Sequence, residues 1–510
     1  MFDAFCLGLA LTVGQGAPVA PAPMPPPEAG RAVVGDELPR RIPAALPSVT
    51  VPPAPTPFLG KVPGVPVSQN KDASTPMPMT PAQPMPEEKK NGEEKKNGEE
   101  KKNGEEEKKE EEKKDDRGCF MKMLDGTEIG CCLKQKNIAI SGWIEGSYTC
   151  SQADITNMPV VWNDRPNQLI LNQWWLRIAS PIDTESKCPS HGWQVDFMFG
   201  TDYRYILQRG FWNEQLQNSQ GKQNFYGFDM PQAFVNYYDP NWMEGTELRL
   251  GKFFTPFGYE SVEGPTTPLK SRSYAFNWAP PFTHWGGMII TNLTKEYQFT
   301  GAIVNGNDVM IGDPAEEARI LAKIAYTSED KKTTWALATS FGRGKFNTGE
   351  PFAPTTISLP FEPAGRNNIN VFDFVASQEL SDELTAAVEL IYGYQYGVPA
   401  NVVGGLIDLS KAPGQTGVAH WGSIAKYFLY KFDDKTTGVL RLEAFDDFEG
   451  QRTGFEGVYW AATAGIQYRP MDCLIVRPEI RYDYNDYSRP FDAGRRHGLC
   501  TATIDMIMKY

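Results

Sequence analysis

The side chains that most often carry catalysis are scattered along this sequence. The four histidines, His191, His284, His420 and His497, form no H-E-x-x-H motif and no pair at metal-ligand spacing. No G-x-S-x-G nucleophile elbow is present. The segment FGRGKFNTGE (341–350) looks like a phosphate loop but lacks the G-x-x-x-x-G-K-[ST] pattern. We therefore predict no catalytic residue, no metal site and no cofactor.

Adjacent carboxylates are the remaining catalytic candidates. Asp446 and Asp447 could act as general acid and base in a glycosidase. Such pairs occur in the loops of almost any acidic β protein, so we interpret this one as a solvated pair that could hold divalent cations beside lipopolysaccharide-like partners. The sequence thus favours a protein that is not an enzyme.

Other charged residues alternate with apolar ones. In 438–445, Leu440 and Leu442 alternate with Arg441 and Glu443, and the same pattern recurs in 474–483. A period of two places successive side chains on opposite faces of a strand. These segments should therefore be strands with one apolar and one charged face.

The same reading of residues 138–510 predicts about sixteen strands. Their ranges are 138–149, 168–179, 192–203, 232–239, 246–254, 286–293, 297–304, 318–327, 333–342, 368–378, 383–396, 420–431, 436–446, 458–468, 472–484 and 499–510. Short links such as 327–332 and 431–435 alternate with long ones such as 255–285 and 343–367. Strict alternation of short and long links is typical of a transmembrane barrel with tight turns on one rim and long loops on the other. We predict an all-β fold, a closed antiparallel transmembrane β-barrel.

In such a barrel the two faces of each strand have different surroundings. Closure pairs the backbone groups of every strand, and the apolar side chains of each strand then face the lipid. The predicted lipid-facing residues are Leu440, Leu442, Val476 and Ile480. The charged residues of the same strands should face the lumen: Arg441, Glu443, Arg477, Glu479, Arg481 and Asp483.

The chain ends on an alternating aromatic strand. Ile504, Met506, Met508 and Tyr510 fall on one face. This ending looks like the C-terminal signature of bacterial outer-membrane barrels, which the barrel-assembly machinery reads.

The first 117 residues have a different composition. Residues 1–17 read like a signal peptide, although Asp3 stands where a basic residue is expected. Residues 18–117 are a Pro-rich stretch followed by EEKKNG repeats, a low-complexity linker expected to be disordered. Such a linker could tether the domain to the cell wall. The eight cysteines include no C-x-x-C pair, and their pairing stays open.

Charge excludes one further class of function. Residues 138–510 carry 42 acidic and 31 basic side chains. An excess of acidic groups disfavours nucleic-acid binding, which needs a basic surface to displace phosphate counterions.

Six stretches of the folded region carry a family resemblance. They are ISGWIEGSYT (140–149), NQLILNQWWLRIASPIDT (167–184), VDFMFGTDYRY (195–205), LRLGKFFTPFGYE (248–260), SRSYAFNWAPPFTHWG (271–286) and VNGND (304–308). Together they resemble the β-barrel porin family 2 (OmpL-like) of bacterial outer membranes, over roughly 138–510. The resemblance implies an outer-membrane porin. We predict that it allows passive diffusion of ions and small hydrophilic solutes, and an even strand count predicts that both termini are periplasmic.

The resemblance also assigns a role to the third long loop, 255–285. In sixteen-stranded porins this loop commonly folds inward and narrows the channel. The pore-constriction candidates are Glu260, Glu263, Lys270 and Arg272, and the alternative is that the charged and aromatic residues of this loop cap the outer rim and only hold the loop down. Opposed charges in a narrow pore set its ion selectivity. The excess of acidic over basic side chains in the folded region predicts that this selectivity weakly favours cations.

The strand pattern is also compatible with a protein that is not a membrane channel. A secreted soluble β-rich protein that binds or cleaves carbohydrate would keep the alternation. Its apolar strand faces would point inward to a core rather than outward to lipid.

Overall fold

The computed structural model describes residues 118–208, 210, 212–216, 224–311, 318–342, 369–399 and 416–510. The predicted signal peptide (1–17) and linker (18–117) lie outside these residues. None of the helices in the described part of the chain is long and apolar enough to cross a membrane.

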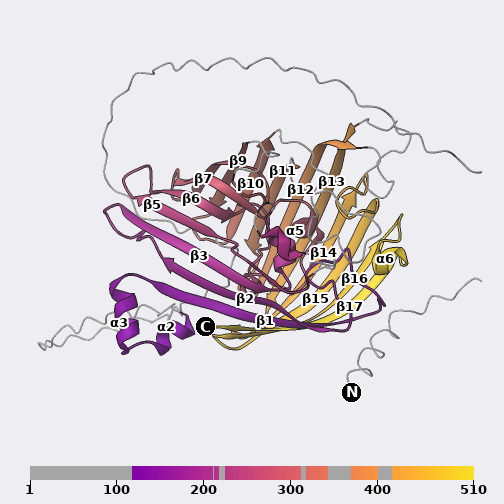
Figure 1. Cartoon of the computed structure of the whole chain (residues 1–510), viewed down its shortest axis with the longest axis horizontal. Helices are drawn as coiled ribbons and strands as arrows, with labels where there is room; N and C mark the ends of the chain where they lie inside the picture. Colours follow the sequence, from indigo (N-terminus) through magenta and orange to yellow (C-terminus); the bar gives the residue numbers. More distant parts are fainter. Residues whose placement is uncertain are drawn as a thin grey trace, which may run out of the picture. The chain divides into compact units, whose positions relative to one another are not determined.

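The described residues form one antiparallel sheet whose first and last strands pair with each other (Figure 1). Its strands are β1 (Ala139–Ser151), β2 (Leu169–Ser180), β3 (Ser190–Gly200), β4 (Gly227–Asp229), β5 (Ala233–Asp239), β6 (Thr246–Phe254), β7 (Thr283–Asn292), β8 (Tyr297–Val304), β9 (Arg319–Thr327), β10 (Thr333–Gly342), β11 (Ile369–Glu379), β12 (Leu384–Pro399), β13 (Thr416–Lys431), β14 (Thr436–Asp447), β15 (Gly457–Met471), β16 (Leu474–Asn485) and β17 (Gly498–Lys509). Both β4 and β5 pair with β3, so the three-residue β4 shares one position with β5. The result is a closed barrel of sixteen strands, which confirms the predicted fold class.

Every predicted strand overlaps an observed one, with ends that shift by a few residues. β13 begins at Thr416, four residues before the prediction, and β7 begins at Thr283 rather than 286. The prediction missed β4 and the short helices, because none of them has a sustained hydrophobic period. These helices are α2 (Cys119–Met123), α3 (Glu128–Gln135), α4 (Tyr203–Ile206), η1 (Asn213–Leu216), η2 (Gly264–Thr266), α5 (Tyr274–Trp278) and α6 (Phe491–Gly494).

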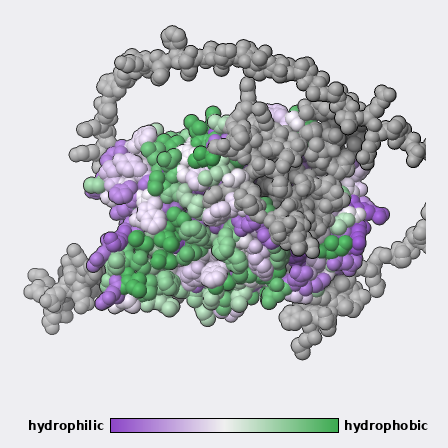
Figure 2. All heavy atoms as spheres, in the orientation of Figure 1, coloured by the Kyte–Doolittle hydropathy of each residue, from purple (hydrophilic) through white to green (hydrophobic). Residues whose placement is uncertain are grey.

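The two faces of the strands differ as the alternation predicts. On β14, Leu440 and Leu442 are 39% and 43% exposed, whereas Arg441 is fully buried and Glu443 is 5% exposed. Hydrophobic side chains gather on the outer face of the barrel, with hydrophilic ones to either side (Figure 2). An apolar face directed outward suits a lipid environment and contradicts the soluble alternative, which requires that face to form the core.

Loop 3 (residues 255–282), which joins β6 to β7, carries α5 and lies inside the barrel. Helix α5 packs against β12, β13 and β14, and Figure 1 shows it surrounded by strands. Its first turn begins at Ser273, whose side chain accepts a hydrogen bond from the backbone N–H of Phe276 at 3.0 Å. The side-chain cap satisfies an N–H group that would otherwise be unpaired at the start of the helix.

An aromatic core joins loop 3 to loop 1 (152–168). Trp162 of loop 1 is fully buried, and its ring lies 5.9 Å from that of Phe276 and 6.1 Å from that of Phe282. The Trp278 indole donates a hydrogen bond to the carbonyl of Pro159 at 3.1 Å. Loop 3 is thus packed inside the barrel by apolar burial as well as by polar contacts.

Candidate functional site

Loop 3 is held in its own shape by contacts between its two arms. The backbone N–H of Ser273 donates to Glu260 Oε2 at 2.7 Å. The guanidinium of Arg272 donates to the carbonyls of Ser261 at 2.9 Å and Lys270 at 2.8 Å. These contacts bring three of the four predicted constriction residues together within the loop.

The first contact between loop 3 and the barrel wall is made by β14. Arg441 pairs with Glu260 of the loop at 2.8 Å and with Glu443 of its own strand at 3.1 Å. Glu443 in turn accepts a hydrogen bond from the backbone N–H of Tyr274 at 2.6 Å. Two charged residues of β14 therefore bind both a side chain and the backbone of loop 3.

The second contact is made by β16. Glu479 accepts hydrogen bonds from the backbone N–H groups of Lys270 at 2.9 Å and Ser271 at 3.0 Å. Arg481 donates to the carbonyl of Arg272 at 2.8 Å. Asp483 pairs with Arg481 at 2.7 Å and accepts a hydrogen bond from the Tyr274 hydroxyl at 2.9 Å.

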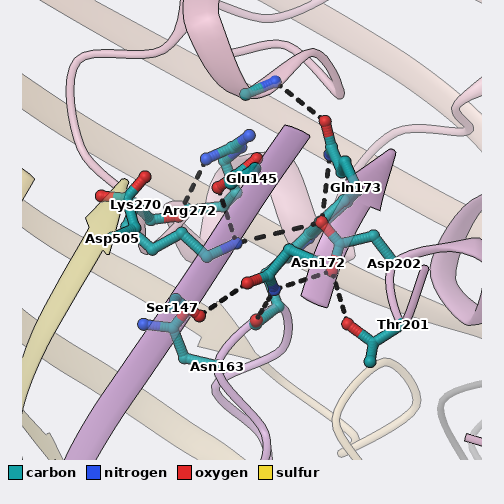
Figure 3. Close-up of polar contacts among 12 residues, drawn as sticks. Glu145, Ser147, Asn163, Asn172, Gln173, Thr201, Asp202, Lys270, Arg272 and Asp505 are labelled. Carbon is teal, nitrogen blue, oxygen red and sulfur yellow. Dashed lines mark hydrogen bonds and ion pairs between the residues drawn. The ribbon is translucent and has the colours of Figure 1, made fainter. Parts of the chain in front are cut away.

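The third contact lies where the barrel closes. Arg477 of β16 pairs with Asp505 of β17 at 2.6 Å and donates to the loop carbonyls of Gly264 and Thr267 at 2.9 and 2.8 Å. The ammonium group of Lys270 lies 3.1 Å from Glu145 of β1 and 3.9 Å from Asp202. Figure 3 shows Lys270 reaching between these two carboxylates.

One ion-pair group of loop 3 is partly open to solvent. Arg177 of β2 pairs with Asp196 of β3 at 2.8 Å and with Glu263 of the loop at 2.5 Å. The side chains of Arg177 and Glu263 are 24% and 15% exposed, whereas those of Glu260 and Lys270 are fully buried. Glu263 is therefore the predicted constriction residue that water reaches.

The buried charges are compensated in two ways. Removing a charge from water costs several kcal/mol per ion, and this cost is offset only when counter-charges and hydrogen bonds surround the ion. Burial lowers the pKa of Arg272, while the carboxylates of Glu145 and Glu260 act in the opposite direction. Backbone N–H and C=O groups of loop 3 supply the remaining partners, so the loop itself stabilises the charged wall.

The structure brings nine of the ten predicted lumen and constriction residues into one network of contacts. The tenth, Glu263, lies in the separate group with Arg177 and Asp196. Sequence reasoning missed their partners Glu145, Asp196, Asp202 and Asp505 and also Arg177. Glu145 and Arg177 lie at inward positions in the predicted strands 138–149 and 168–179. A charged residue between apolar neighbours in a membrane strand indicates a lumen-facing partner, so the sequence could have identified these two residues.

The predicted C-terminal face is exposed on the outside of the barrel. Ile504, Met506 and Met508 of β17 are all exposed. The Tyr510 hydroxyl donates a hydrogen bond to the carbonyl of Trp175 at 2.7 Å. The structure thus places these side chains at the outer surface near the junction of β17, β1 and β2.

The catalytic candidates have structural roles in the described residues. Asp447 is buried and accepts hydrogen bonds from the backbone N–H groups of Arg452 and Thr453, whereas its neighbour Asp446 lies on the opposite face of β14. The His284 ring contacts the carbonyl of Gly306 at 2.9 Å. The described residues contain no group of three or more His, Cys, Asp or Glu that could hold a metal ion. Most of segment 341–350 lies outside the described residues.

Several solved outer-membrane proteins have a similar fold at low sequence identity. Each of the following is 10% identical to this chain and covers 73% of it with a TM-score of 0.47: the outer-membrane channel DcaP of Acinetobacter baumannii (97% of that chain), the anion-selective porin from Comamonas acidovorans (99%) and Salmonella typhi OmpF in complex with daunomycin (97%). The curated proteins include no match.

A family model matches most of the chain. The family is described as "Putative beta-barrel porin-2, OmpL-like", and its model covers residues 137–510, which include every strand of the barrel. Its members are channels rather than enzymes, which confirms the prediction that the protein is not an enzyme. The chain therefore belongs to the β-barrel porin-2 (OmpL-like) family and is an outer-membrane porin-like channel.

Proposed function

We propose that the protein is a passive diffusion pore for ions and small hydrophilic solutes, narrowed by a fixed loop 3. Sixteen strands enclose more space than side chains fill. Loop 3 occupies the part of that space next to β14, β16 and β17. The observation that carries the proposal is the binding of loop 3 backbone groups by Glu443, Glu479 and Arg477.

The same contacts divide the four constriction candidates by role. Glu260, Lys270 and Arg272 hold the loop in place, because they are buried in contacts with the wall or within the loop. Glu263 borders the water-filled part together with Arg177, and the buried Asp196 lies behind Arg177. This group carries one positive and two negative charges, so it favours cations weakly.

Orientation completes the proposal. The long loops face the cell exterior, the short turns face the periplasm, and both ends of the barrel domain are periplasmic. The linker would then reach the cell wall, and the face formed by Ile504, Met506, Met508 and Tyr510 would be read by the barrel-assembly machinery.

The experiment is a planar-bilayer recording of the purified protein with a salt gradient. We expect stable, ohmic channels and a reversal potential that indicates a small excess of cation permeability. Absence of channels from protein that is folded and inserted would refute the pore. A reversal potential of anion-selective sign would refute the assignment of Glu263 and Asp196.

A further inference from the structure

Three buried polar side chains with unpaired oxygen atoms face residues 258 and 259, here called the tip of loop 3. Both carboxylate oxygens of Glu389 on β12 are unpaired, and so are Oδ1 of Asp373 on β11 and the hydroxyl of Tyr427 on β13. All three residues are at most 2% exposed. Buried carboxylates without partners are costly, so a native structure normally provides them with a counter-ion, a proton or water.

The strand register places the three side chains next to one another. Glu389 is opposite Val375 and Asp373 is opposite Ile391, so the two acids are diagonal neighbours on the inner face of β11 and β12. Glu389 is also opposite Ala425, which makes Tyr427 its diagonal neighbour on β13. Diagonal neighbours on one face are within reach of long side chains.

The tip of loop 3 covers this group. The backbone N–H of Gly258 donates to Asp373 Oδ2 at 2.7 Å, and the ring of Tyr259 lies 4.4 Å from that of Tyr427. A Cβ atom on Gly258 would lie 3.5 Å from Glu389 Oε1. The backbone N–H of Tyr259 is directed toward Glu389, but neither carboxylate oxygen accepts a hydrogen bond of ordinary geometry.

The local charges leave an excess of negative charge. The charged side chains that act most strongly on Glu389 are three acids, Asp373, Glu260 and Glu443. Glu260 and Glu443 share Arg441, as described above. The cation that acts on Asp373 is Lys323 of β9. Glu389 therefore has three acidic neighbours, and no basic side chain is among the groups that act most strongly on it.

We propose that Glu389, Asp373 and the Tyr427 hydroxyl bind one divalent cation of the Ca²⁺ type beneath the tip of loop 3. The donors are all oxygen atoms, which hard cations prefer, and none is a sulfur or an imidazole nitrogen. Two carboxylates leave several coordination positions to water, so the site should be weak, in the millimolar range typical of extracellular sites. The bound ion would fix the loop tip to β11–β13, on the side away from the contacts with β16 and β17.

Terbium provides a direct probe of this site. Tb³⁺ takes the same oxygen ligands as Ca²⁺ and luminesces when a nearby Tyr or Trp is excited, and Tyr259 and Tyr427 lie at the site. Residues 1–117 contain many acids but no Tyr or Trp, so that segment has no Tyr or Trp of its own to sensitise Tb³⁺. We expect the full chain in detergent to show saturable luminescence that Ca²⁺ displaces.

Variants then locate the ion. Glu389→Gln should lower the Tb³⁺ affinity by about tenfold or more, because it removes one of two charged ligands. Lys323→Met should raise the affinity, because it removes the cation that competes for Asp373. Glu329→Gln, a change of an exposed acid in the β9–β10 turn, should leave the affinity unchanged.

Each result decides the proposal. Two results would overturn the proposal: an unchanged Tb³⁺ affinity in folded Glu389→Gln, or a Tb³⁺ affinity in Lys323→Met no higher than that of the unmodified chain. Either result would show that protons or water occupy the group instead. Ca²⁺ should also raise the melting temperature of the unmodified chain and not that of Glu389→Gln. Equal shifts in both would overturn the assignment. The measurement does not involve conductance, so it stands or fails independently of the proposed pore function.

Discussion

Glu479 of β16 accepts a hydrogen bond from the backbone N–H of Ser271 in loop 3 at 3.0 Å, across 208 residues of sequence. A hydrogen bond to a charged acceptor contributes about 1.5–3 kcal/mol, roughly twice the value for a neutral pair. Because the donor belongs to the loop backbone, no substitution of Ser271 other than by proline removes it.

The first prediction concerns this anchor. Glu479→Gln weakens two hydrogen bonds to loop 3 and should destabilise the protein by about 2–3 kcal/mol. Single-channel recordings should show larger or noisier current steps, because the loop leaves the wall more often. Glu329→Gln in the exposed turn is the matched control, and steady currents of unmodified size in Glu479→Gln would contradict a fixed loop.

The second prediction separates two acids that sequence alone treats as equivalent. Glu263→Gln should lower the cation-to-anion permeability ratio without a change in stability greater than about 1 kcal/mol, because this partly exposed ion pair is screened by water and salt. Glu260→Gln should instead lower the melting temperature, because it leaves the buried Arg441 without one of its counter-charges. Reversal potentials and thermal unfolding of both variants check this assignment. A reversal-potential change confined to Glu260→Gln would refute it.

A third prediction tests the outward face. Leu442→Arg should cost about 2–4 kcal/mol of folding free energy in lipid vesicles, the range for Arg at the midplane of a barrel. Leu442→Met is the control of similar volume and should cost less than about 1.5 kcal/mol. Equal stability of the Arg and Met variants would mean that this face is not in contact with lipid.

The fourth prediction concerns pH. Asp164 of loop 1 pairs with Arg204 at 2.9 Å. Burial raises the pKa of Asp164, but the charge and hydrogen bonds of Arg204, together with Arg165 and Tyr205, outweigh burial and hold that pKa below its ordinary value of 3.8. A depressed pKa in the folded state means that the pair stabilises the protein above pH 3.8 and that this contribution is lost as pH falls through the lower value. The melting temperature should therefore fall less steeply below pH 4 in Asp164→Asn, which is already destabilised by about 3 kcal/mol at pH 7. Parallel pH profiles for the two proteins would contradict this role.

Much of the barrel could be predicted because its information is local. The alternation of Leu440, Arg441, Leu442 and Glu443 fixes which side chains face outward, since successive residues of a strand point to opposite faces. Link lengths then fix the order of turns and loops. Strand ends were less accurate, as at β13, because ladder pairing continues beyond the apolar run.

The partners of the charged residues could not be predicted in the same way. Glu443 and Glu479 bind backbone N–H groups, which every residue except proline carries, so no residue type identifies the donor. The ion pair between Arg477 and Asp505 depends on strand register, and that between Lys270 and Glu145 depends on the path of loop 3. The unpaired state of Glu389 likewise becomes visible only once its neighbours are placed.

The closure of the barrel between β1 and β17 has an internal counterpart. Lys270 pairs with Glu145 on β1, while Gly264 and Thr267 bind Arg477, which in turn pairs with Asp505 on β17. Loop 3 thus connects β1 to β17 from inside the barrel, in addition to the ladder of backbone hydrogen bonds that pairs the two strands. The first and last strands cannot separate without disturbing the loop, so the join between the two ends of the barrel and the narrowing of its lumen form one cooperative unit.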